Sequence, residues 1–475
     1  MLEGLYLITP EGPKQQVFKT VQAALDGGAR VVQYRDKQRP PEAQIEIARE
    51  LAQLCHQQGA TFLVNDHPQV ASASNADGVH LGQQDLSIQE ARRTLGPAKL
   101  IGVSTHSIDQ AIKAEMAGAD YIGVGAMFAT QNKENAEQIG IEALRKIRRA
   151  VKIPIVAIGG LSATNSPAAI EAGANAVAVI SAVISDPKPA LAARELSLLF
   201  NRRKDKGATR VMTVAGSDPG GGAGIQADLK TIGLLGSFGT SVITVLTAQN
   251  TQGVHGLSPA SVSFVDKQME LVLDDIGTDT LKTGMLYSPE IIATVAESIA
   301  RHNLLAVVDP VMIAKGGAAL LKKEAVRALR ELLLPQTFLL TPNIPEAEAL
   351  TGIKITGPDE MEEAARTLHE FGARNVLVKG GHRDSVDSND LLLTDDMVVP
   401  LPGERFATNS THGTGCSFAA ALATLLAQGC GLTEAAQKAK LFISAAIRQA
   451  IPLGQGQGPI NHAAGAQAVL EQSQH

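Results

Sequence analysis

At 475 residues the chain is longer than one hydrophobic core usually serves, because single cores stop growing at roughly 250 to 300 residues, so two domains are expected. A formal net charge of −6, no Trp and only four Tyr exclude the basic surface and stacking aromatics of a nucleic-acid-binding protein. The three cysteines form no disulfide or metal-ligand pattern, and no continuously apolar run approaches the ~18 to 20 residues that span a bilayer, so we expect a cytoplasmic protein without a membrane partner.

Short runs rich in Val and Ile alternate with helix-like stretches over the first 200 residues. The runs are Gly4–Thr9, Ala29–Arg35, Thr61–Asp66, Gly78–Leu81, Leu100–Ser104, Tyr121–Phe128, Pro154–Gly160 and Ala176–Ser181. Eight such β-α repeats are typical of a compact (β/α)8 TIM barrel, in which the active site lies at the carboxyl ends of the strands. The polar residues of each run cluster at that end, so we expect the site there.

The second run carries two cations and an amide in alternation. Gln33, Arg35 and Lys37 are spaced so that the pleat of a strand should direct all three to one face, which in a barrel points inward. Inward cations need a negative partner, because an unpaired buried charge is costly. The pattern predicts either an anionic ligand or an internal salt bridge to a carboxylate.

Carboxylates and glycines follow later runs. Asp66 ends the third run and Asp85 lies in the loop after the fourth, and hard oxygen ligands beside cations favour Mg²⁺ holding a diphosphate. The alternative is that each Asp caps the helix that follows it. Gly159, Gly160 and Ser181, after the last two runs, match the usual phosphate site of such barrels, although glycines there can also serve packing alone.

A charged segment, NRRKDKGATR, separates the two halves. It predicts a first domain over residues 1–200, a linker over 201–209 and a second domain over 210–475, with a surface loop inside one domain as the alternative. Downstream strand-like runs lie at Val211–Gly216, Thr240–Ala248, Leu281–Gly284, Ala306–Asp309, Phe338–Thr341 and Asn375–Lys379. Their alternation with helical patterns predicts an α/β domain with an open, mostly parallel sheet flanked by helices.

Two glycine clusters precede helices in the second half. SDPGGGAGIQADL is not a Walker A motif, because no G-K-[ST] follows, and alone it indicates only a tight turn. Gly413, Thr414 and Gly415 stand directly before a strongly helical run, where free backbone amides form an anion site. In a kinase such amides would receive the charge of the transferred phosphoryl group, whereas the plain alternative is an ordinary glycine-rich helix start.

Taken in order, YLIT, QYRDK, FLVNDH, GVHLGQQDLS, IGVSTHS, DYIGVG, IVAIGG and AVIS resemble thiamine-phosphate synthase over nearly all of residues 1–200. The resemblance implies that hydroxymethylpyrimidine diphosphate condenses with a thiazole phosphate, with loss of diphosphate through a pyrimidine carbocation. It implies diphosphate binding by Arg35, Lys37, Asn65 and the catalytic Lys133, Mg²⁺ binding by Asp66 and Asp85, pyrimidine binding by Gln33 and Ser104, and further substrate contacts by Thr130, Gly160, Ile180 and Ser181. The sequence departs from the family pattern at Pro10, Ala126, Ala129 and Asn132, which puts the rate of the reaction in question more than the fold.

In the second half, TPNIPEAEAL, VVDPVM and VKGGH resemble the ribokinase-like fold, and AGSDPGGGAGIQADLKT, VLTAQNTQGV and THGTGC resemble hydroxymethylpyrimidine (phosphate) kinase over about residues 210–465. The resemblance implies pyrimidine contacts by Asp228 and Gln249, Mg²⁺ organised by Asn343 and Glu346, ATP phosphates on Lys379, and an anion hole from Gly413, Thr414, Gly415 and Cys416. Cys416 replaces the Asp general base of most ribokinase-like enzymes. It would position or deprotonate the substrate hydroxyl, or serve only as a small structural residue.

Together the two resemblances predict a bifunctional enzyme of thiamine biosynthesis that uses ATP and Mg²⁺. Its second domain would make the diphosphate that the first consumes, so its partners would be small pyrimidine and thiazole phosphates. A homo-oligomer is left open. The alternatives are a kinase, of the pyridoxal type or not, fused to a thiazole tautomerase, or a barrel that binds thiamine phosphate without catalysis and regulates the kinase.

Overall fold

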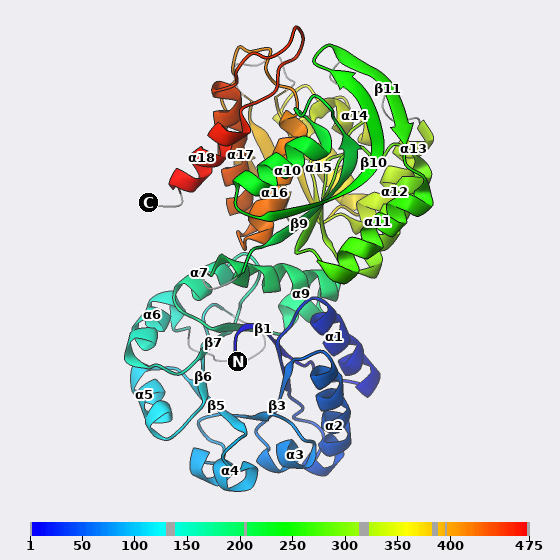
Figure 1. Cartoon of the computed structure of the whole chain (residues 1–475). Coiled ribbons are helices and arrows are strands. Elements are labelled where there is room, and N and C mark those ends of the chain that lie inside the picture. Colours follow the sequence, from blue (N-terminus) through cyan, green and yellow to red (C-terminus); the bar gives the residue numbers. More distant parts are fainter. Residues whose placement is uncertain are drawn as a thin grey trace. The chain divides into compact units, whose positions relative to one another are not determined.

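The structure is a computed structural model that describes residues 2–129, 138–203, 207–312, 323–381, 388–394 and 397–472 (Figure 1). The chain divides into two compact units, Met1–Phe200 and Asn201–His475. Within the described ranges no helix is long and apolar enough to cross a membrane.

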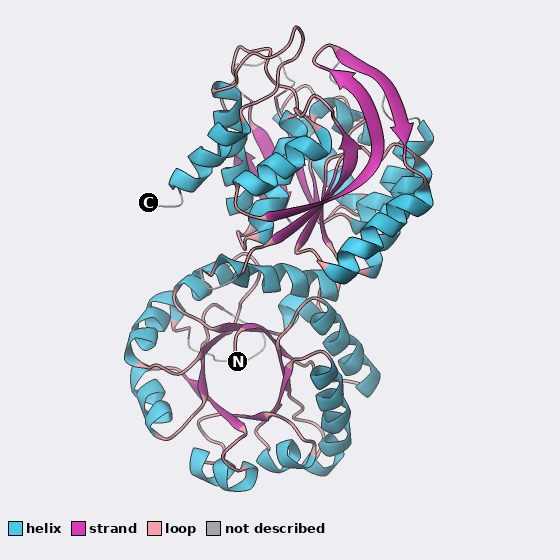
Figure 2. Cartoon of the chain, viewed as in Figure 1, coloured by secondary structure: helices cyan, strands magenta, loops and turns pink. Residues whose placement is uncertain are grey.

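The first unit is a closed barrel of parallel strands in sequential order, ringed by helices (Figure 2). The strands are β1 (Gly4–Ile8), β2 (Val31–Tyr34), β3 (Thr61–Asn65), β4 (Gly78–Leu81), β5 (Leu100–Thr105), β6 (Tyr121–Val124), β7 (Ile155–Ile158) and β8 (Ala176–Val179). The helices are α1 (Lys14–Asp26), α2 (Pro41–Gln57), α3 (Pro68–Ala73), α4 (Ile88–Leu95), α5 (Ile108–Met116), α6 (Gly140–Ala150), α7 (Ser166–Glu171), α8 (Ser181–Ile184), α9 (Pro189–Leu198) and the 3-10 helix η1 (Leu199–Arg202). All eight predicted strands are confirmed, and β1 closes the ring by pairing with both β2 and β8.

Alternation along the strands builds two cores in this unit. Leu5 and Leu7 of β1 face outward and belong to the large cluster between the strands and the helices. Tyr6, between them, belongs to a smaller cluster inside the barrel, together with Tyr121 of β6. Because neighbouring side chains of a strand point to opposite faces, each strand serves both cores, and its carboxyl end presents side chains at one rim.

The second unit is an open sheet with the strand order β11-β10-β9-β12-β13-β14-β15-β16-β17. The strands are β9 (Arg210–Ser217), β10 (Phe238–Asn250), β11 (Gly253–Pro259), β12 (Thr280–Thr283), β13 (Leu305–Val308), β14 (Leu339–Leu340), β15 (Asn375–Val378), β16 (Asp390–Thr394) and β17 (Met397–Leu401). The six predicted strands form its parallel centre. The prediction missed β11, β16 and β17, which pair antiparallel at the two edges.

Helices cover the sheet of the second unit. They are α10 (Gly224–Leu234), α11 (Val262–Asp275), α12 (Pro289–Arg301), α13 (Lys323–Ala328), α14 (Ile344–Thr351), α15 (Pro358–Glu370), α16 (Thr414–Ala427), α17 (Leu432–Arg448) and α18 (His462–Gln472), with the short turns η2 (Leu329–Leu333) and η3 (Leu334–Gln336). Helix α16 is buried on all sides from Ser417 to Ala427, as expected of a helix that is apolar around its whole circumference. It packs against α10, α17 and the strands β9, β12 and β13.

The predicted linker, residues 201–209, is described in part. The Asn201 side chain donates a hydrogen bond to the Ala427 carbonyl at 2.9 Å, and Arg202 pairs with Glu434 at 3.2 Å. Asn201 and Arg202 belong to the second unit, so these are contacts within that unit. The assignment of the whole segment as a linker stays a prediction.

Candidate active sites

The rim of the barrel after β2 combines an amide that points inward with two cations in the following turn. Strand β2 ends at Tyr34, so only Gln33 is placed by the pleat; it is 3% exposed, and its amide nitrogen lies 2.7 Å from the Tyr6 hydroxyl. Arg35 and Lys37 lie beyond the strand. The prediction that one strand directs all three side chains to the same face was therefore wrong.

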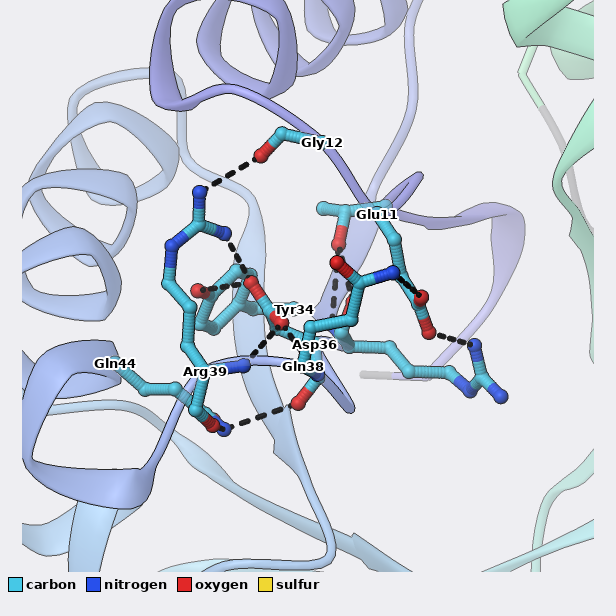
Figure 3. Close-up of polar contacts among 9 residues, drawn as sticks. Glu11, Gly12, Tyr34, Asp36, Gln38, Arg39 and Gln44 are labelled. Carbon is cyan, nitrogen blue, oxygen red and sulfur yellow. Dashed lines mark hydrogen bonds and ion pairs between the residues drawn. The ribbon is translucent and has the colours of Figure 1, made fainter.

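The turn after β2 is held by a buried carboxylate, as Figure 3 shows. Asp36 accepts hydrogen bonds from the backbone amides of Gln38 and Arg39, both at 3.0 Å, and pairs with the Arg39 guanidinium. Arg39 also donates to the Gly12 carbonyl at 2.9 Å, and Gln44 donates to the Asp36 carbonyl at 3.0 Å. Because Asp36 stands between Arg35 and Lys37, these bonds fix where the two cations leave the backbone.

Arg35 has a carboxylate partner. Its guanidinium lies 3.2 Å from Glu11 in the loop after β1, and both side chains are about one-third exposed. The salt bridge that the sequence left open as an alternative is thus present. At this exposure it contributes little stability and does not prevent Arg35 from meeting a ligand.

Two carboxylates from neighbouring strand ends meet at the same rim. Burial and the nearby Asp85 carboxyl raise the pKa of Asp66 to about 6, while the charges of Lys37 and Arg35 pull it down. Asp85 in turn accepts a hydrogen bond from the Gly82 amide at 2.6 Å. Four charged side chains predicted to act together therefore influence one another at the ends of β2, β3 and β4.

This group fits a magnesium ion shared with a phosphate-bearing ligand. Mg²⁺ usually takes one or two carboxylates from the protein and completes its shell with water and substrate phosphates. Among the residues that the structure describes, no group of three or more His, Cys, Asp or Glu side chains could hold a metal. Two carboxylates beside two cations match the shared arrangement and not a metal cage built from protein alone.

A chain of hydrogen bonds crosses the barrel interior from Gln33 to Ser104. The Tyr6 and Tyr121 hydroxyls are 3.2 Å apart, the Tyr121 hydroxyl lies 2.9 Å from His80 Nδ1, and His80 Nε2 lies 2.9 Å from the Ser104 hydroxyl. Burial raises the pKa of both tyrosines and lowers that of His80 to about 4, so all three side chains are neutral at neutral pH. We call these five residues the interior chain. The sequence analysis gave no role to Tyr6, His80 or Tyr121, although all three lie inside its quoted segments.

The rim after β7 and β8 carries two glycines in the left-handed region. Gly159 and Gly160 have φ angles of 97° and 66°, a region that favours glycine, and a Cβ at Gly160 would meet the Ala129 carbonyl at 2.4 Å. Ile180 is the N-cap of α8, and Ser181 is its first residue. The space that a Cβ would take at both glycines is filled by the segment from Ala126 to Ala129, which is the packing role that the sequence left open. The predicted phosphate contact stays a prediction. The predicted Thr130 and Lys133, with Asn132, lie outside the described residues.

In the second unit, the start of α16 packs against the other glycine-rich loop. Gly413 has φ 82°, and a Cβ there would meet the Gly222 carbonyl at 1.7 Å, so only glycine fits. One residue into the helix, a Cβ built on Gly415 would lie 3.3 Å from an Asp309 oxygen and 3.4 Å from the Lys379 ammonium. The start of α16 therefore lies beside a cation and a carboxylate, and the Thr414 amide makes a long hydrogen bond of 3.4 Å to the Thr411 carbonyl.

Lys379 and Glu346 flank this helix start. Lys379 Nζ lies 2.8 Å from Asp309 Oδ1, and its backbone pairs with Asn343 in an isolated bridge. Asn343 and Glu346 form a capping box at α14, with reciprocal hydrogen bonds of 2.8 and 2.9 Å. Burial raises the pKa of Glu346 to about 7, although Lys379 opposes the shift. The three predicted nucleotide-site residues are thus neighbours, and Asp309 was missed although it lies in the quoted VVDPVM.

A fully buried ion pair lies close to Cys416. Lys282 Nζ is 2.7 Å from Asp228 Oδ2, neither side chain has exposed surface, and Thr213 donates to the same oxygen at 2.6 Å. Burial alone would lower the pKa of Lys282, but Asp228, together with Cys416 and Asp309 nearby, outweighs it and raises the pKa. Burial also raises the pKa of the Cys416 thiol, to about 11. Asp228 was predicted to contact the pyrimidine. One of its two carboxylate oxygens is occupied by Lys282 and Thr213, and the predicted contact stays untested.

Gln249, at the end of the long strand β10, meets residues of both glycine-rich loops. Its amide nitrogen lies 3.2 Å from His412 Nε2, which is 3.0 Å from Asp218 Oδ2. Asp218 also accepts backbone hydrogen bonds from Gly220, at 2.8 Å, and from Gly222 and Ala223. Burial opposes ionisation of Asp218, but the bonds from His412 and the amides hold its pKa below the usual value. Asp218 and His412 lie in the quoted SDPGGG and THGTGC segments and had no assigned role.

Known proteins similar to the two units identify the class of enzyme to which each unit belongs. The second unit is similar to the pyridoxal kinase of Bacillus subtilis solved with ADP, at 39% identity and a TM-score of 0.52 over 54% of this chain and 98% of that chain. The family described as phosphomethylpyrimidine kinase matches residues 218–461, and that described as thiamine monophosphate synthase matches residues 5–183. The chain therefore joins two transferases, a TIM-barrel synthase and a ribokinase-like kinase.

The particular family follows from relatives that span this arrangement. The thiamine biosynthesis bifunctional protein ThiED of Geobacter sulfurreducens is 52% identical over 472 residues, which cover 99% of this chain and 96% of that protein. The hydroxymethylpyrimidine/phosphomethylpyrimidine kinase of Bacillus subtilis is 46% identical over 53% of this chain and 94% of its own length. The chain belongs to the family of bifunctional thiamine biosynthesis proteins, with a thiamine-phosphate synthase domain followed by a hydroxymethylpyrimidine/phosphomethylpyrimidine kinase domain.

Proposed function

We propose that the barrel binds the pyrimidine diphosphate with its diphosphate at the ends of β2, β3 and β4. The observation that supports this is the meeting of Asp66 and Asp85 with Arg35 and Lys37 at one rim. Departure of diphosphate develops negative charge on the leaving oxygens, so cations fixed in advance lower the barrier to forming the pyrimidine carbocation. Mg²⁺, held by the two carboxylates, would neutralise further charge on those oxygens.

The remaining barrel residues would hold the two organic groups. Gln33 and Ser104 face the pyrimidine, Asn65 and Lys133 add diphosphate contacts, and Thr130 adds a substrate contact. The backbone at Gly160, Ile180 and Ser181 takes the thiazole phosphate. No general base is required for loss of diphosphate, because the charge moves with the leaving group.

For the kinase, we propose that the amides of Gly413, Thr414 and Gly415 receive the charge of the transferred phosphoryl group. Lys379 contacts ATP phosphates, while Asn343 and Glu346 organise Mg²⁺ and its waters. Gln249 and Asp228 contact the pyrimidine. With its raised pKa the Cys416 thiol stays protonated at neutral pH, which favours positioning of the substrate hydroxyl over removal of its proton.

One reaction tests both halves. Purified chain with hydroxymethylpyrimidine, MgATP and thiazole phosphate should yield thiamine phosphate and diphosphate. Asp66→Asn should stop the reaction after the pyrimidine diphosphate accumulates, whereas Cys416→Ala should slow formation of that intermediate and leave its condensation intact when it is added. Thiamine phosphate formation without Mg²⁺, or unaltered in Asp66→Asn, would refute the proposed rim site.

A second kinase substrate has specific support. The second unit is 39% identical to a pyridoxal kinase, so parallel assays with pyridoxal and hydroxymethylpyrimidine are informative. We propose the pyrimidine as the preferred substrate. We further propose domain boundaries at 1–200 and 210–475 with the linker at 201–209, and function in the cytoplasm without nucleic acid or membrane partners.

A further inference from the structure

The interior chain links the two groups that face the pyrimidine, although they come from strands on different sides of the ring. Gln33 of β2 connects through Tyr6 of β1, Tyr121 of β6 and His80 of β4 to Ser104 of β5. Tyr6 and Tyr121 are 1% and 0% exposed. No water competes for hydroxyls this deeply buried, so each must satisfy its neighbours in the chain.

Two inward-facing glycines leave the space that the side chains of the interior chain occupy. A Cβ at Gly102 would lie 2.4 Å from the Tyr121 hydroxyl, and a Cβ at Gly123 would lie 3.1 Å from His80 Cε1. Both positions face inward on β5 and β6, where most barrels place branched apolar residues. The space is therefore dedicated to a tyrosine and a histidine that the packing of a barrel does not itself require.

The number of hydrogens available in the interior chain determines which residue donates and which accepts in each of its hydrogen bonds. A tyrosine hydroxyl carries one hydrogen, and a neutral imidazole has one donor and one acceptor. With the Gln33 amide nitrogen donating to Tyr6, the Tyr6 hydroxyl must donate to Tyr121, and Tyr121 to His80 Nδ1. His80 Nε2 then carries the hydrogen and donates to Ser104. Reversing any one link alone leaves two donors or two acceptors facing each other in a buried site, which is unfavourable.

The two ends of the chain consequently present opposite groups to a ligand. Among the residues that the structure describes, the Gln33 carbonyl oxygen is left as an acceptor and the Ser104 hydroxyl hydrogen as a donor. A ring that offers an amino N–H beside an unprotonated ring nitrogen matches this pair. A ring with an oxo group beside a protonated nitrogen offers the reverse pattern and would require every link to invert.

We propose that Tyr6, Tyr121 and His80 are positioning residues that fix the hydrogen-bond direction of Gln33 and Ser104, and so select a 4-aminopyrimidine over its 4-oxo analogue. The inference rests on the proposed pyrimidine site of the barrel. None of the three residues needs to touch the reacting atoms.

The test compares the 4-amino and 4-oxo hydroxymethylpyrimidine diphosphates as synthase substrates. In Tyr121→Phe the preference for the amino compound, as a ratio of kcat/KM values, should fall about tenfold, because the direction of the chain is no longer enforced. Tyr6→Phe should act in the same sense. Tyr34→Phe is the matched control. Tyr34 is equally buried but faces the outer core, and its bond to Asp36 at 3.2 Å bears on the diphosphate that both substrates share, so the substrate ratio should stay unchanged. The kinase activity of the same chain reports on the integrity of each preparation.

A second measurement determines which nitrogen of His80 carries the hydrogen, and therefore the direction of hydrogen-bond donation. Nitrogen-15 NMR of the full chain labelled at histidine, with a His80→Gln variant for assignment, should show His80 with its hydrogen on Nε2, and Tyr121→Phe should abolish that strict preference. A hydrogen on Nδ1, or an unaltered substrate ratio in Tyr121→Phe with an active wild type, would overturn this inference alone. A wild-type chain that makes no thiamine phosphate would overturn the proposed synthase site and this inference with it.

Discussion

Replacing Lys282 by Met should strongly destabilise the second unit. The Lys282–Asp228 pair has no exposed surface, and the second Asp228 oxygen has no hydrogen-bond partner among the described residues, so Lys282 is the main compensation for that buried charge. Removing one partner of a buried pair costs about 3 to 5 kcal/mol. With about 2 to 4 °C per kcal/mol for a unit of this size, the melting temperature should fall by roughly 6 to 20 °C.

Calorimetry of the full chain measures this shift, and two further variants test its origin. Lys354 pairs with Glu348 at 3.0 Å but is 80% exposed, so Lys354→Met should cost less than about 1 kcal/mol. The double variant Asp228→Asn with Lys282→Met removes both charges and should recover part of the loss. A Lys282→Met chain as stable as Lys354→Met, or a double variant whose loss is the full sum of the two single losses, would refute the reasoning.

Three predictions concern activity. Below pH 6 the Mg²⁺ concentration for half-maximal synthase rate should rise about tenfold per pH unit, because protons compete with the metal for Asp66, whose pKa is raised to about 6; a constant Mg²⁺ requirement down to pH 5 would contradict this. Lys379→Met should raise the KM for ATP about tenfold or more, whereas Lys440→Met, from a similar pair with Asp390, should not; equal effects would remove the phosphate contact. Cys416→Ala should lower the kinase kcat up to about 10²-fold through lost positioning, and full turnover would remove Cys416 from the site.

The central strands could be read from the sequence because each is a short apolar run between helical patterns. The edge strands could not. Strand β11 contains two glycines and ends at Pro259, and β17 contains Pro400, so neither shows the apolar alternation that predicts a strand. Their pairing depends on β10 and β16 being already in place.

The candidate sites show a similar division. Residues at strand ends, such as Asp66 and Gly160, could be chosen because a barrel gathers its strand ends at one rim. The strand β2 was predicted to continue past Tyr34. Its true end could not be predicted from the sequence, because it depends on the turn that Asp36 and Arg39 form. The interior chain was missed for the same reason: Tyr6 and Tyr121 are 115 residues apart, and only closure of the ring brings them together.

The contact between Gly413 and the Gly222 carbonyl has an evolutionary consequence. The segments around Gly222 and Gly413 lie nearly two hundred residues apart in the sequence but are in direct contact. Neither can lengthen, or gain a side chain at this point, without displacing the other. His412 and Asp218 join the same two segments. Insertions and deletions in the two loops should therefore be inherited as matched pairs, and kinase variants with new substrates should arise by changes at Gln249 and its surroundings while this junction stays constant.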